Sequence, residues 1–151
     1  MARLVLDRAP ERARQLTGAR YAALAVMNQR GDGLEHFFTA GVDEETRRWI
    51  ERPPCGRGVL GELILNPRPL RLTDVRQHPS SYGFPPGHPV MRSFLGVPIM
   101  LGRQAWGSLH LAEKTEGEFT QADEDSMVCL AEEAANTIRY ERRHRGKAAV
   151  A

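Results

Sequence analysis

The chain has 151 residues, of which 41% are hydrophobic and 26% are charged, and its formal net charge is +2. We expect a single domain over residues 1–151, with a core from about 8 to 142 and a basic tail or linker from 143 to 151. The near balance of charge argues against nucleic acid as a partner. No apolar run reaches the roughly 18 residues that a membrane span requires.

The start of the chain lacks the hydrophobic region of a signal peptide. The two cysteines, Cys55 and Cys129, stand far apart and form no CxxC pair. Reduced thiols are therefore expected, which suits a cytoplasmic protein with no membrane partner.

The first half of the chain predicts a short helix, a β-hairpin and two further helices. The turn signal at 30–33 (Arg-Gly-Asp-Gly) separates two apolar runs, as in a hairpin. Asp43 is followed by two glutamates, a good helix start. In chain order the expected elements are Ala9–Leu16, Tyr21–Asn28, Leu34–Ala40, Asp43–Ile50 and Val59–Leu65.

The second half predicts a brief strand, a long loop, two strands and a final helix. The final helix begins at Thr120, which forms a capping-box pattern with Asp123. The expected strands are Leu70–Leu72, Phe94–Leu101 and Ala105–Glu113. Together these elements predict an α+β domain, in which helices cover an antiparallel sheet of about five to six strands.

Strict alternation in the strand Ala105–Glu113 divides its side chains between two faces. One face would carry Trp106, Ser108, His110 and Ala112, and the other Gly107, Leu109 and Leu111. His36 and His144 are interpreted as surface residues.

The long loop carries a histidine in an unusual setting. Prolines surround His88 in the segment 83–92 (GFPPGHPVMR), and they restrict its backbone conformation. Long loops inside a domain are usually functional. A rigid imidazole beside the apolar Phe84 and Met91 is what a buried ligand site needs.

Several motifs resemble those of GAF domains. The residues Glu113-Lys114, Phe119 and Asp123-Glu124 are similar to the family's Asn-Lys…Phe…Asp-Glu signature, with Glu113 in place of Asn. The runs FLGVPI and WGSL in the last two strands are also typical of the family. The likeness spans roughly residues 8 to 142 and implies the GAF fold.

Longer segments resemble the first GAF domain of the mycobacterial hypoxia-sensing (dormancy survival) histidine kinases. They include 56–75 (GRGVLGELILNPRPLRLTDV), 78–98 (HPSSYGFPPGHPVMRSFLGVP) and 107–117 (GSLHLAEKTEG). In those kinases this domain holds b-type haem. The resemblance implies that His88 is the proximal iron ligand here.

Three positions depart from the haem-binding pattern. The family's distal tyrosine falls at His110, and two polar residues at the haem edge fall at Ala25 and Met27. We hypothesise a haem b site with His88 as proximal ligand and His110 on the distal side, in an apolar pocket drawn from Met27, Phe84, Met91, Leu95, Val97 and Trp106.

The sequence leaves the role of His110 open. His88 alone would give a five-coordinate iron open to O2, NO or CO. His110 would then either hydrogen-bond the bound gas or ligate iron. Ligation would make the iron six-coordinate, as in a redox sensor or in a gas sensor whose ligand must displace a histidine. A packed, hydrogen-bonded core histidine is the third outcome.

The resulting hypothesis is a haem-binding gas or redox sensor module of a two-component-type signalling protein. We expect a homodimer through the terminal helices, and a charged rod, Asn136–Arg145, that joins an output domain such as a histidine kinase. The alternative is a haem-free GAF domain for dimerisation, signal relay or small-molecule binding. Catalysis is not expected, because a thiol-dependent reductase built on Cys55 would need cooperating cysteines and only Cys129 remains.

Overall fold

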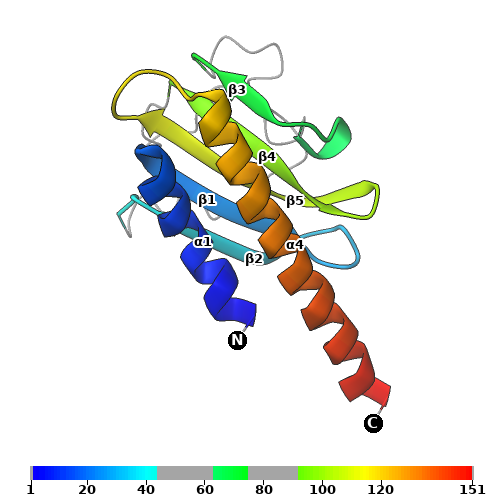
Figure 1. Cartoon of the computed structure of the whole chain (residues 1–151). Helices are drawn as coiled ribbons and strands as arrows, with labels where there is room; N and C mark the ends of the chain where they lie inside the picture. Colours follow the sequence, from blue (N-terminus) through cyan, green and yellow to red (C-terminus); the bar gives the residue numbers. More distant parts are fainter. Residues whose placement is uncertain (1, 44–62, 75–91, 151) are drawn as a thin grey trace.

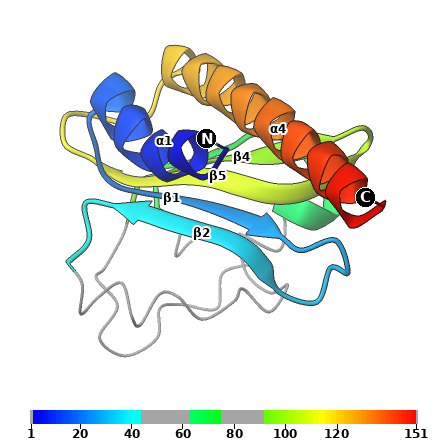
Figure 2. The same ribbon diagram turned by 90° about the horizontal axis from the view of Figure 1, so that it is seen from below.

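The computed structural model describes residues 2–43, 63–74 and 92–150. Five strands form one antiparallel sheet in the order β2-β1-β5-β4-β3 (Figure 1). The two long helices, α1 (Ala2–Thr17) and α4 (Gln121–Val150), lie together on one face of this sheet (Figure 2). The strands are β1 (Ala19–Met27), β2 (Leu34–Ala40), β3 (Leu70–Leu72), β4 (Phe94–Leu101) and β5 (Gln104–Lys114).

The predicted α+β architecture with an antiparallel sheet is confirmed. The predicted hairpin is β1–β2, and the strands on either side of Gly102 are β4 and β5. The predicted helices Asp43–Ile50 and Val59–Leu65 lie mostly outside the described residues, although 63–65 are helical. No helix in the described ranges is long and apolar enough to cross a membrane.

The first helix is longer than predicted, because it begins at Ala2 and contains Pro10 in its interior. Proline removes one helical hydrogen bond and crowds the preceding turn. Leu6, Ala9 and Ala13 are buried against the sheet, and Pro10 itself is fully buried. Tertiary packing therefore compensates for Pro10. From the local sequence alone, Pro10 would be expected in the first turn of a helix that begins later.

The main core lies between the sheet and the two helices. Alternate strand residues such as Leu24, Val97 and Leu109 are fully buried there, and so are Met127 and Ile138 of α4. Burying each such side chain is worth roughly 1.5–3 kcal/mol. This apolar face fixes where α1 and α4 lie.

Lys114 and Asp123 join the end of β5 to the start of α4. The Lys114 ammonium lies 2.6 Å from Asp123 Oδ2, which also accepts a hydrogen bond from the Thr120 N–H at 2.9 Å. The Thr120 hydroxyl accepts a hydrogen bond from the Asp123 N–H in return, so the predicted capping pattern is confirmed. Burial would raise the pKa of Asp123, but the Lys114 and Thr120 hydrogen bonds and the Lys114 charge outweigh it and lower that pKa below 3.8.

Replacing Asp123 with Ala should lower the free energy of unfolding by about 2 kcal/mol, because the helix cap is lost and Lys114 loses its partner. Urea unfolding measures this. The control is Asp125→Ala, since Asp125 is exposed and accepts one hydrogen bond, from Gln121. Because the folded pKa of Asp123 is lowered, its contribution is present at neutral pH and is lost as pH falls below 3.8. Equal losses of unfolding free energy in the two variants would contradict the role of Asp123 as helix cap and partner of Lys114.

Candidate functional site

The face of the sheet opposite α1 and α4 carries short side chains around one histidine. His110 of β5 lies between Ala23 of β1 and Gly96 of β4, its partners in the two ladders. Ser108, one position along the same face, lies between Ala25 and Pro98. We call this the small-residue face; it comprises Ala23, Ala25, Gly96, Ser108, His110 and Ala112.

The His110 ring is partly buried and has two close neighbours. Its Nδ1 lies 3.4 Å from the Ser108 hydroxyl oxygen, and the ring stacks on Phe94 with 6.2 Å between centroids. Burial lowers the pKa of His110 from the usual 6.5 to about 4. The imidazole is therefore neutral at physiological pH, with one nitrogen that donates and one that accepts.

Leu63 and Phe94 form a wall beside His110. A Cβ at Gly96 would lie 2.7 Å from the Leu63 side chain and 2.8 Å from the Phe94 ring. Leu70 and Leu72 of β3 pack against the same pair. On the β1 side, Ala23 and Ala25 offer only methyl groups. The side chains beside His110 on β1 are thus much smaller than those on the β4 side.

Two of the predicted haem contacts lie on the other face of the sheet. Leu95 and Val97 alternate with Gly96, so they point into the core beneath α4, where both are buried. They are separated from His110 by the sheet itself. The hypothesis grouped these residues as one apolar pocket without considering the strand face on which each one lies.

Trp106 also departs from its predicted position. Ile99 pairs with Gly107 and Met100 with Ala105, so Trp106 is the extra residue of a β-bulge. Its ring lies 5.1 Å from the Arg142 guanidinium of α4. The expectation that Trp106 shares a face with His110 is wrong, because the bulge interrupts the alternation.

Of the remaining residues singled out from the sequence, some lie within the described residues and others outside them. Met27 is partly buried at the end of β1, beside a second bulge. The predicted ligand His88, with Phe84, Met91 and Cys55, lies outside the described residues. Cys129 is an exposed residue of α4.

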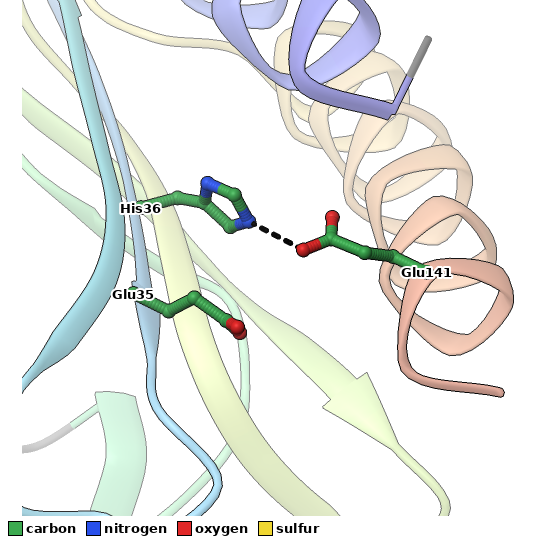
Figure 3. Close-up of side chains that lie close together, drawn as sticks. All are labelled: Glu35, His36 and Glu141. Atoms are coloured by element: carbon green, nitrogen blue, oxygen red, sulfur yellow. Dashed lines mark hydrogen bonds and ion pairs between the residues drawn. The ribbon is translucent and has the colours of Figure 1, made fainter. Parts of the chain in front are cut away.

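A second polar cluster was missed from the sequence. His36, which was expected at the surface, has a side chain only 14% exposed, and its Nε2 lies 3.3 Å from Glu141 of α4 (Figure 3). Glu35 ion-pairs with Arg142 and Arg145 of the same helix. The alternation of side chains along β2 places His36 on the core face with Phe38. This alternation was the one sequence signal that His36 is shielded from solvent.

The family is now defined by a direct match. A family model described as a GAF domain matches residues 3–139, and the chain therefore belongs to the GAF domain family. The signature residues Lys114 and Asp123 have a structural role here, since they join β5 to α4.

Solved structures share the fold at low sequence identity. The GAF domain of a phosphoenolpyruvate-protein phosphotransferase from Coxiella burnetii matches with a TM-score of 0.83 and 21% identity, over 96% of this chain and 86% of that one. Free methionine-R-sulfoxide reductase from Neisseria meningitidis, in complex with its substrate, matches with a TM-score of 0.74 and 20% identity, over 95% of this chain and 83% of that one. A domain described as that of a two-component sensor histidine kinase from Sinorhizobium meliloti matches with a TM-score of 0.67 and 12% identity, over 95% of this chain and 94% of that one.

The neutral state of His110 predicts a pH dependence of stability. The unfolded chain binds a proton near pH 6.5 and the folded chain near pH 4, so the unfolding free energy should fall as pH drops through that interval, by roughly 3 kcal/mol at most. His110→Gln should flatten this part of the profile in urea unfolding from pH 7 to pH 4. His144→Gln, at an exposed histidine, is the control and should keep it. A profile unchanged by His110→Gln would contradict the burial of this imidazole.

Proposed function

We propose that this GAF domain is a haem-free sensory module that binds a small organic molecule on the small-residue face. The observation that carries the proposal is the neutral imidazole of His110 among the short side chains of Ala23, Ala25 and Ser108. Short side chains let a ligand approach the strand backbone closely. The imidazole then orients the ligand with one donor and one acceptor.

The same residues define the ligand chemistry. Every member of the small-residue face is uncharged at neutral pH, and the Phe94 ring stands beside His110. An uncharged or weakly polar planar molecule suits such a surface better than a strong anion, whose desolvation would be uncompensated there. The Neisseria reductase of the same fold was determined with its substrate bound, which supports a small-molecule role for the fold. Catalysis is not part of the proposal.

Signal relay is proposed to run through the terminal helices of a homodimer, in a signalling protein with an output domain such as a histidine kinase. Val5 and Leu16 of α1 are 41% and 56% exposed, and Tyr140 of α4 is 64% exposed. Apolar side chains on two adjacent helices favour a helix-mediated contact between copies of the chain.

A thermal-shift panel of haemin, free methionine sulfoxide and cyclic nucleotides tests small-molecule binding. At least one organic compound other than haemin should raise the melting temperature of the wild-type protein. Ala23→Leu should abolish that shift, because the larger side chain would stand where the ligand is proposed to contact His110, and His110→Gln should weaken it. Ala122→Leu, the same substitution at an exposed position of α4, is the control. A shift that survives in Ala23→Leu, with the variant folded, would refute binding on this face.

The second candidate is the haem-binding gas or redox sensor. One observation favours it: a neutral His110 is able to ligate iron through Nε2 when Nδ1–H donates to the Ser108 hydroxyl. The fit is partial, since Leu95, Val97 and Trp106 do not line this face. His88 remains the proposed proximal ligand of haem b, with O2, NO or CO as gas ligands.

Absorption spectra after haemin addition, in the ferric and ferrous states, separate the two candidates. The haem-free proposal predicts a broad band that does not saturate and is equal in wild type and His88→Ala. A sharp Soret band that disappears in His88→Ala would overturn it in favour of the haem sensor. Ferrous α/β bands lost in His110→Ala would add His110 as the second axial ligand.

A further inference from the structure

Helix α4 changes its mode of attachment after Ile138. Up to that residue its inner side is buried in the apolar core, through residues such as Met127, Ala134 and Ile138. Beyond it, none of the described side chains of α4, which extend to Arg145, is buried. The contacts from 139 to 145 are instead made by charged groups.

Two neighbouring side chains of β2 reach this charged part of α4. Val26 pairs with His36 and Met27 with Leu34, so Glu35 is the extra residue of a β-bulge. A bulge re-aims a side chain that would otherwise point to the opposite face. The consecutive residues Glu35 and His36 therefore both point toward α4, where His36 contacts the Glu141 carboxylate (Figure 3).

The bulge in β5 also places a side chain, Trp106, next to α4. Strand β5 is separated from β2 by β1 alone. Arg142 stacks over Trp106, donates to the Met27 carbonyl at 2.8 Å and lies 3.5 Å from Glu35. Val26 pairs with both His36 and Gly107, so the two bulges occupy the same end of the sheet. Both supply side chains to the same part of one helix.

Arg145 completes the cluster by pairing with Glu35 and Glu141. The ligand atoms of Glu35, His36 and Glu141 lie within 4.8 Å of one another, which is compatible with a metal ion. However, Arg145 already contacts both carboxylates, and Arg142, only 13% exposed, adds a second guanidinium charge. Two carboxylates and two guanidinium groups balance, and a divalent cation would be repelled by the arginines.

We propose that residues 139–145 of α4, together with Glu35, His36 and Trp106, form a releasable charge latch. This segment docks on the sheet through ion pairs and separates from it while the helix up to Ile138 stays packed. Ion pairs are screened by salt, and the apolar contacts up to Ile138 are not. The 51% exposed Arg145 marks the side from which the charge latch opens. Its state sets whether the C-terminal rod extends rigidly from the core. The proposal does not depend on which ligand the domain binds.

Hydrogen exchange of the full chain tests the charge latch. Glu35→Gln keeps the shape of Glu35 and removes its charge, and amides in 139–145 should then exchange about tenfold faster. Amides in 127–138 should be unchanged. The matched control is Glu133→Gln, which breaks an exposed ion pair between Arg12 of α1 and Glu133 of α4, outside the latch. It should leave exchange in 139–145 as in wild type.

A salt series on the wild-type protein makes the test independent of the variant's folding. Raising NaCl from 50 mM to 1 M should reproduce the exchange pattern of Glu35→Gln. In a Trp49→Phe background, fluorescence of Trp106 should change over the same range as Arg142 leaves its ring. Exchange in 139–145 that is insensitive to salt would overturn the proposal. So would acceleration that is equal along the whole of α4.

Discussion

The alternation of strand side chains is the constraint on which the rest of the molecule depends. Leu24, Val97 and Leu109 point to one face and are sealed by α1 and α4. Their neighbours along the strands must point the other way. This second set does not pack against the helices, and around His110 it includes several small residues. One face packs against the helices, and the other is the face on which we propose that a ligand binds.

Two bulges modify this arrangement at one end of the sheet. They turn Glu35 and Trp106 toward the helix-covered face, so that the charged part of α4 meets side chains from β2 and β5. Trp106 stands two residues before Ser108 on the same strand. Strand β5 thus carries both a residue of the small-residue face and a residue of the charge latch.

Local sequence signals predicted most of the fold. The Gly-rich turn predicted β1–β2, and Thr120 with Asp123 predicted the start of α4, because these signals depend on a few adjacent residues. The length of α1 was wrong, since Pro10 is tolerated only through contacts with distant strands. Bulges leave no mark on apolar periodicity. The positions of Trp106 and Glu35 therefore required the strand register.

The candidate site was predicted in part. His110 was singled out because it falls at the family's distal tyrosine, on a strand position expected to point inward, and its neutral state follows from burial that only the fold reveals. Leu95 and Val97 were assigned to the same pocket as apolar residues, and the pairing register of β4 with β5 was needed to show that they face the core. The small residues Ala23 and Gly96 gave no chemical signal of their own. Their role arises because two strands flank His110.

The most direct test of the small-residue face is a methyl NMR spectrum of alanine-labelled protein, recorded with the compound that raises the melting temperature most. Ala22 and Ala23 are adjacent in β1 but point to opposite faces, and Ala134 of α4 reports on the core. We expect the methyl signals of Ala23, Ala25 and Ala112 to shift while those of Ala22 and Ala134 stay in place. Shifts confined to Ala22 and Ala134 would contradict binding at the small-residue face and move the ligand to the helix side of the sheet.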